Sequence, residues 1–236
     1  MHLKLAHTVR INSLYLCADM SNSHDFKIKN KGQATLFHSK KLEVLTKTSP
    51  QVIFSIYIPI ISAMIIYSLV VANVAWYAVI GFYFFGMFFW TFFEYLMHRF
   101  VFHNDSHNPR IQKITYTAHG VHHEFPRDKD RLFMPPVPSL LIATIMYSIF
   151  YLIMKGYAFS FFPGFVSGYL AYGSMHYAIH AFAPPFRFMK SWWRYHHLHH
   201  YKEPDMGFGV SSPMWDHVFG TVPKTVGKFD NPEALD

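Results

Sequence analysis

The chain has 236 residues, of which 51% are hydrophobic, 19% aromatic and only 15% charged. A single cysteine, Cys17, excludes an intrachain disulfide, and the low charge content argues against a disordered chain. The formal net charge of +7 suits anionic lipid headgroups, and the sequence carries no motif typical of DNA or RNA recognition. These numbers predict one membrane-associated unit that binds no nucleic acid.

The first 50 residues are polar. Eight Lys and Arg residues fall within residues 1–47, and Arg10 interrupts what would otherwise be the apolar core of a signal peptide. Ser39–Lys47 could form a short interfacial helix. We therefore expect a polar leader over residues 1–50, a membrane domain over residues 51–223 and a C-terminal tail over residues 224–236.

Long uncharged stretches predict membrane-crossing helices. Residues 51–93 contain no Lys, Arg, Asp or Glu. As one helix this stretch would extend roughly 65 Å, about twice the ~30 Å hydrocarbon core of a bilayer. Two crossings with a turn near Val70–Ala75 fit that length better than one.

A second apolar pair follows further along the chain. Val137–Met154 and Ala158–Ala178 are uncharged, and only Lys155 separates them. Pro163 is expected in the first turn of the later helix, where its missing N–H costs little.

Four crossings place both termini and the central segment on one side of the membrane. Of the 21 Lys and Arg residues, 20 then fall on that side, which the positive-inside rule assigns to the cytoplasm. The predicted fold is all-α and integral to the membrane, with four transmembrane helices and a cytosol-facing helical cap. The membrane would be the endoplasmic reticulum in a eukaryote or the inner membrane in a bacterium. The alternative is a soluble protein that buries these helices in its core.

Histidine is the unusual component of the sequence. Thirteen of the 17 histidines lie between His98 and His217. Ten of them form four clusters on the predicted cytosolic side, at the membrane boundary. The clusters are His98 with His103; His119, His122 and His123; His176 with His180; and His196, His199 and His200.

The spacing of these clusters predicts a site for two metal ions. Residues i and i+4 share a helix face, whereas the i+3 residue lies about 100° away from the i+4 residue. In an H-x-x-H-H helix the first and last imidazoles can therefore bind one metal while the middle one reaches another. Nitrogen-only ligand sets suit zinc, iron or copper. For a single histidine, the simpler interpretation would be a proton relay or a pH sensor. A metal transporter would need polar residues in the middle of the membrane, where these helices are apolar.

Other residues near the clusters are assigned weaker roles. Glu94 is four residues before His98 and could accept its free ring N–H. His197 has no partner at helical spacing and is expected outside the ligand set, behind a ligand or at the surface. The remaining histidines are not expected to bind the metals: His2, His7, His24, His38, His107 and His217.

Six motifs resemble the membrane fatty acid hydroxylase/sterol desaturase superfamily, and within it most closely the fatty acid 2-hydroxylases that act on ceramide-type lipids. The resemblance covers roughly Ser39 to Pro223. The motifs are Thr91–His103, His119–His123, Arg131–Pro138, His176–His180, Tyr195–Tyr201 and Gly207–Thr221.

The resemblance implies that all ten clustered histidines are metal ligands. Five would hold one metal: His98, His103, His119, His123 and His199. Five would hold the other: His122, His176, His180, His196 and His200. It also implies iron in the working enzyme, with zinc possible in a purified protein, and O2 as co-substrate.

The implied activity is an O2-dependent 2-hydroxylation of the acyl chain of fatty acids or ceramides and other sphingolipids. The chain departs from the family pattern at Gly173, where many members have Asp, and at Ala181, where some have another His. No haem-binding segment is visible in residues 1–50, so we expect electrons from a separate carrier such as cytochrome b5. Sterol desaturase, methyl oxidase or carotenoid hydroxylase activity remains an alternative, as does a non-catalytic metal-binding membrane protein. Acyl length, stereochemistry and oligomeric state stay open.

Overall fold

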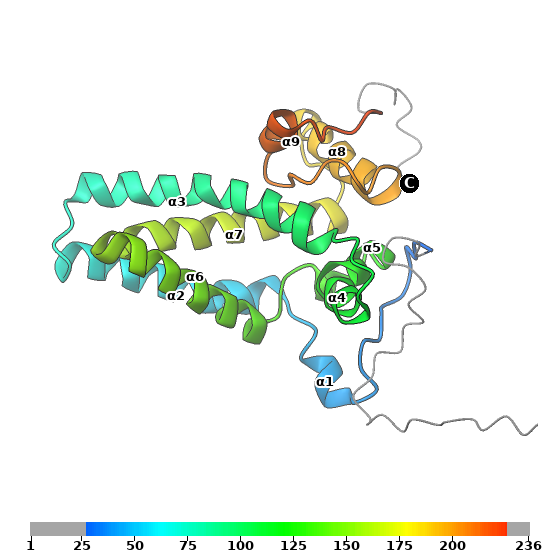
Figure 1. The fold of residues 1–236 in the computed structure, drawn as a ribbon, viewed down its shortest axis with the longest axis horizontal. Coiled ribbons are helices and arrows are strands. Elements are labelled where there is room, and N and C mark those ends of the chain that lie inside the picture. Colours follow the sequence, from blue (N-terminus) through cyan, green and yellow to red (C-terminus); the bar gives the residue numbers. More distant parts are fainter. Residues whose placement is uncertain (1–26, 226–236) are drawn as a thin grey trace, which may run out of the picture.

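The computed structural model describes residues 27–225, and this part of the chain is helical without a β-strand. Four long helices lie side by side, and α4, α5 and α8 gather at one end of them (Figure 1). We call residues 97–131 and 182–225 the cap. The helices are α1 (Lys40–Val44), α2 (Pro50–Val70), α3 (Trp76–Leu96), η1 (Met97–Phe102), α4 (Pro109–Thr115), η2 (Tyr116–Gly120), α5 (Val121–Glu124), η3 (Lys129–Arg131), α6 (Pro136–Met154), η4 (Lys155–Tyr157), α7 (Ala158–Ala181), η5 (Arg187–Met189), α8 (Lys190–Tyr201) and α9 (Met214–Phe219).

The long helices carry apolar side chains on their outer surface. Ile66, Phe84 and Leu152 are each at least 60% exposed. A soluble protein that buried these helices in its core would not leave such side chains in water, whereas lipid accommodates them. Three helical segments of the described chain are long and apolar enough to cross a membrane: Pro50–Val70, Trp76–Phe102 and Lys129–Ala181.

The predicted long helices agree with the structure to within a few residues at their ends, but the expected place of one proline does not. The turn expected near Val70–Ala75 is confirmed, because α2 ends at Val70 and α3 begins at Trp76. The prediction for Pro163 was wrong. This residue is the sixth of α7 and lies inside the helix, because α7 continues directly from the 3₁₀ turn η4. Pro163 is fully buried, and neighbouring helices make such prolines tolerable in apolar helices.

Glycines bring α3 and α7 into close contact. A β-carbon on Gly164 of α7 would lie 1.8 Å from the Tyr83 carbonyl oxygen, and one on Gly168 would lie 2.5 Å from Cβ of Trp90. A β-carbon on Gly86 of α3 would likewise lie 2.1 Å from the Phe161 carbonyl oxygen of α7. Small residues four apart let helix backbones approach without an intervening side chain. This contact fixes the position of the cap ends of α3 and α7 relative to each other.

The described part of the leader, residues 27–49, packs against the cap. Ala34 and Leu36 are buried in one cluster with Tyr116 and Val121. Arg131 forms ion pairs with Glu43 and with Asp128. Of the interfacial helix expected over residues 39–47, α1 forms only the central five residues. This part of the leader therefore contributes to the structure that surrounds the histidines.

Candidate metal centre

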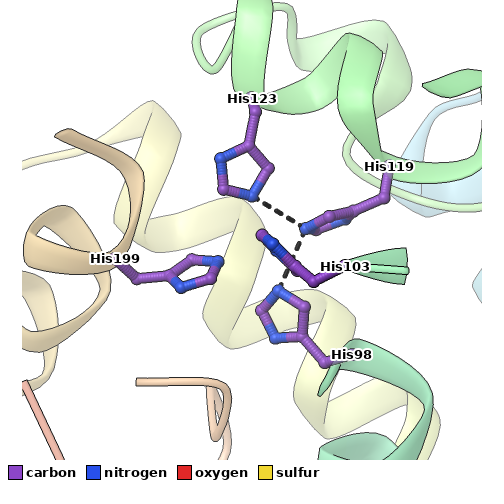
Figure 2. A group of neighbouring side chains, drawn as sticks. All are labelled: His98, His103, His119, His123 and His199. Atoms are coloured by element: carbon purple, nitrogen blue, oxygen red, sulfur yellow. Dashed lines mark hydrogen bonds between the residues drawn. The ribbon is translucent and has the colours of Figure 1, made fainter. Parts of the chain in front are cut away.

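The ten clustered histidines meet at the cap ends of α3 and α7 in two groups of five. Within each group, one ring nitrogen from every residue lies within 4.8 Å of the others. We call these the first and the second histidine group; the first is drawn in Figure 2. The first contains His98, His103, His119, His123 and His199, and the second contains His122, His176, His180, His196 and His200.

A π-helical turn brings His98 and His103 to the same point. In an α-helix, residues five apart differ by about 140° around the axis. Here η1 is a π-helix, and the His103 N–H donates to the His98 carbonyl, 3.1 Å away. The i→i+5 bond places the two rings 5.0 Å apart at their centroids. Short π-helical segments are rare and are frequent at functional sites.

The first H-x-x-H-H segment divides its histidines between the groups as its spacing predicts. Nε2 of His119 lies 2.9 Å from Nε2 of His123 and 3.0 Å from Nε2 of His98 (Figure 2). The ring of His122 instead lies 4.4 Å from that of His176 in the second group.

The H-x-x-H-H segment in α8 is also divided between the two groups. Its outer pair, His196 and His200, lies in the second group, and its middle histidine, His199, lies in the first. Nε2 of His196 lies 3.1 Å from Nε2 of His200 and 2.9 Å from Nε2 of His180. The ring of His199 lies 4.6 Å from that of His98 in the first group. The two groups adjoin where the rings of His123 and His200 stack, with their centroids 4.2 Å apart.

The donor geometry fits metal ions. Metal–imidazole bonds of about 2.1 Å at right angles put neighbouring nitrogens about 3.0 Å apart, which matches the separations above. Neither ring nitrogen of His122, nor Nε2 of His199, has a hydrogen-bond partner among the described residues, although both rings are buried. A buried nitrogen without a partner is costly, and a bound cation would satisfy it. The residues present therefore suit two cations with nitrogen ligands.

Backbone carbonyls orient two rings of the first group. Nδ1–H of His98 donates to the Phe208 carbonyl at 2.6 Å, and Nδ1–H of His199 donates to the Met206 carbonyl at 2.7 Å. In a neutral imidazole the other nitrogen, Nε2, then carries the lone pair and faces the group. The loop 206–212 therefore selects the tautomer that can bind a metal.

Two buried carboxylates hold this loop. Glu94 accepts from the N–H groups of Val210 and Ser211, at 2.7 and 2.9 Å, and from the Ser211 hydroxyl. The predicted bond from His98 to Glu94 was thus wrong, because the Phe208 carbonyl takes that position. Glu94 acts on His98 indirectly, by fixing the loop that carries this carbonyl.

Asp216 is the second of these carboxylates, and the sequence reasoning missed it. It is fully buried and accepts from the N–H groups of Phe208 and Gly209 at 2.9 and 2.8 Å. The Thr221 hydroxyl also donates to it at 2.8 Å. Asp216 lies in the quoted Gly207–Thr221 motif, but a lone Asp 16 or more residues from every clustered histidine offers no spacing pattern.

We expect Asp216→Asn to weaken metal binding without removing a ligand. The amide NH2 would face a backbone N–H, so at least one of the two buried loop bonds would be lost. Loss of a group that hydrogen-bonds to a metal ligand typically costs about 10- to 100-fold in affinity; because Asp216 acts through the loop that carries the Phe208 carbonyl, we expect a loss at the lower end, about tenfold. Competition titration with a chelator measures the effect. An unchanged affinity would contradict the positioning role of Asp216; Asp205→Asn, on the exposed surface, is the matched control.

Burial keeps five of the cap imidazoles uncharged. It lowers the pKa of each of these five well below the ordinary value of 6.5, and neighbouring imidazoles lower the pKa further. The rings are therefore neutral near pH 7, which is the form that binds metals. The five residues concerned are His119, His122, His196, His199 and His200.

The metal-free protein should lose stability in mild acid. A ring whose pKa is lower in the folded than in the unfolded state binds protons preferentially when unfolded. The free energy of unfolding then falls below about pH 6.5, by up to about 1.4 kcal/mol per pH unit for each ring. Thermal unfolding of chelator-treated protein between about pH 8 and about pH 5 measures this slope. His122→Ala should reduce this dependence of stability on pH, whereas His107→Ala, at an exposed site, should not. A thermal unfolding midpoint that does not change with pH would contradict the expected loss of stability.

The other histidines of the described residues lie outside both groups. His197 is partly buried, 6.3 Å from the His180 ring between centroids, and burial lowers its pKa to about 4. His107, His217 and His38 are exposed, and His2, His7 and His24 lie outside the described residues. At Gly173, where many family members have Asp, this chain has no space for a side chain, because the Phe133 ring lies 2.2 Å from where a β-carbon would be.

Comparison with known proteins gives consistent matches. The chain is 36% identical over 197 residues to the ceramide very long chain fatty acid hydroxylase scs7 of Schizosaccharomyces pombe, covering 82% of this chain and 56% of that protein. It is 39% identical over 141 residues to the dihydroceramide fatty acyl 2-hydroxylase FAH1 of Arabidopsis thaliana, covering 59% of this chain and 60% of that protein. The chain thus spans little more than half the length of these relatives.

A solved structure described as full-length scs7p, with only the hydroxylase domain visible, superposes with a TM-score of 0.74. It is 36% identical and covers 81% of this chain and 73% of that one. The family model described as fatty acid hydroxylase matches residues 83–221, which include all ten histidines of the two groups. With this match over more than half of its length, the chain belongs to the fatty acid hydroxylase family.

Proposed function

We propose that this chain is a membrane-bound, O2-dependent dimetal monooxygenase that hydroxylates C2 of the acyl chain of fatty acids or ceramides. The observation that carries the proposal is the convergence of ten buried or half-buried histidines in two adjoining groups of five. The names of the relatives supply the substrate class. In the overall reaction, a C–H bond, O2, two electrons and two protons give a C–OH bond and water.

Two metal ions, iron in the active protein, would supply the binding and reduction of O2. The first histidine group would hold one ion and the second group the other. Zinc could occupy the same nitrogen ligands in a purified protein. The chain's own contribution is to keep the imidazoles neutral and to fix the lone pairs of His98 and His199 through the carbonyls of loop 206–212.

An aromatic layer lies beneath the second group on the bundle side. The Tyr172 ring stacks on the His176 ring with centroids 5.6 Å apart, and Trp90 lies 5.9 Å from Tyr172. Phe133 and Tyr169 extend this layer toward α2. Aromatic rings in this position would limit the access of water and guide an alkyl chain to the metals, as oxidation of an unactivated C–H bond requires.

We infer four crossings, formed by α2, α3, α6 and α7, with the cap in the cytoplasm. The segment Lys129–Ala181 contains both α6 and α7. With four crossings, 20 of the 21 Lys and Arg residues lie on the cap side, which supports the orientation. The membrane would be the endoplasmic reticulum or a bacterial inner membrane. A separate electron carrier such as cytochrome b5 would dock on the cap.

Lipid analysis in a suitable host tests the reaction. The chain is expressed in cells that lack 2-hydroxylated lipids, and the hydrolysed acyl chains are analysed by mass spectrometry. We expect 2-hydroxy fatty acids from the parent chain and from the exposed-site control His107→Ala. Oxidised sterols or carotenoids instead would indicate a different oxidase of the superfamily. Unmodified lipids in the presence of iron and an electron donor would favour a metal-binding protein without this activity.

A further inference from the structure

A pocket in the cap reaches the first histidine group. Its volume is about 170 Å³, and its lining includes His103, His119 and His123. His200 is the one member of the second group that lines it. Nine of its ten lining residues lie outside the segments that could cross a membrane, the exception being Phe102. The pocket therefore lies between the cap and the leader and not in the apolar bundle.

The described part of the leader forms one wall of this pocket. Ile28 lines it, and the next two residues are bonded to the ends of both cap helices that carry histidines. The Lys29 N–H donates to the Glu124 carbonyl at 2.7 Å, and its ammonium group bonds to the Glu124 carboxylate at 2.6 Å. The Tyr201 hydroxyl donates to the Asn30 side chain at 2.8 Å. These bonds hold Ile28 over the first group.

Size and lining decide what the pocket can admit. Pockets for drug-sized ligands have volumes of about 300 Å³ or more, whereas a single water needs only about 10–15 Å³ of accessible space. Ile28 and Pro204 are apolar, while Tyr201 and Lys202 are polar, the latter a cation. Such a lining suits small neutral or anionic molecules and has no room for a long acyl chain.

The two groups differ in their access to this pocket. In the second group all five histidines are buried, whereas His103 of the first is only partly buried. Of the second group, His200 lines the pocket, and its ring contacts those of His122, His180 and His196, which do not line it. A small molecule in the pocket would therefore meet the first group before the second.

We propose that this pocket is the entry and binding site for small ligands of the metal in the first group, namely water, dioxygen and small anions. It would be separate from the route of the lipid, which under the proposed function runs along the apolar bundle. The proposal rests on the proposed function for the presence of the metals. It adds that the two metals differ in access, because the metal in the first group would exchange its small ligands through this pocket.

Azide binding tests the pocket without any need for turnover. The full chain is loaded with cobalt(II), and the change in visible absorption on adding azide is followed by stopped flow. Ile28→Trp should fill the pocket and slow azide association about tenfold or more, equivalent to ~1.4 kcal/mol in barrier. Ile28→Ala should bind azide at least as fast as the parent. Ile111→Trp adds the same bulk to the exposed face of α4 and should leave the rate unchanged.

Equal azide rates in Ile28→Trp and the parent would overturn the proposal, as would the absence of any azide-induced change. If Ile28→Trp does not fold, Pro204→Trp fills the pocket from another wall and carries the same expectation. Removal of cobalt by a hydrophilic chelator should be slowed by the same variants. If the proposed hydroxylation fails, the lipids stay unmodified while the azide kinetics keep their dependence on Ile28, so the two failures are distinguishable.

Discussion

His122→Ala is expected to abolish the proposed hydroxylation and to remove about one metal ion per chain. His122 is buried, and its ring lies within 4.6 Å of those of His176, His180 and His200, centroid to centroid. Substitution of a residue that hydrogen-bonds to a metal ligand typically costs about 10- to 100-fold in metal affinity or activity. Loss of the ligand itself should therefore cost at least about 100-fold in activity. Mass spectrometry of acyl chains and elemental analysis of the purified protein measure the two effects.

His107→Ala is the matched control, because His107 is exposed and belongs to neither group. It should keep both the activity and the metal content of the parent. Circular dichroism should show the same helix content in both variants. An active His122→Ala protein with full metal content would show that the second group is not a metal site.

Gly164→Leu is expected to disrupt the centre from a distance. The leucine would force α7 away from the Tyr83 backbone of α3, which now lies 1.8 Å from the β-carbon position. Overpacking of this kind costs about 3 kcal/mol in the free energy of unfolding and forces the backbones apart. Since α3 leads to His98 and α7 carries His176, the variant should also lose metal. Thermal unfolding and metal analysis in detergent measure both changes.

Gly81→Leu provides the matched control on α3. Nothing lies within 4 Å of a β-carbon at Gly81, so the same substitution meets open space there. It should leave stability unchanged or raise it slightly, because leucine favours helix more than glycine does. Equal behaviour of the two variants would mean that the close contact of α3 and α7 does not matter for the centre.

Local spacing was enough to predict part of the centre. In the two H-x-x-H-H segments, helical geometry alone separates the middle His from the outer pair, and the structure places His122 and His199 accordingly. The pairing of His98 with His103 is different. Five residues apart, they share a face only because η1 is a π-helix, which no α-helical pattern predicts.

The parts that the sequence did not reveal depend on contacts between distant segments. Glu94 is close to His98 along the helix, yet its carboxylate bonds to Val210 and Ser211, more than 100 residues away. Asp216 acts on the first group through Phe208, whose N–H donates to Asp216 and whose carbonyl accepts from His98. The wall formed by Ile28 comes from a polar segment that composition alone marks as a leader. Such long-range contacts leave no periodicity to read.

The metal content of the protein, purified in lipid and measured by elemental analysis, tests the central claim most directly. Two groups of five nitrogen donors predict two ions per chain, a ratio that should fall toward one in His122→Ala. A fully folded protein that holds one ion or none after iron loading would contradict a dimetal centre.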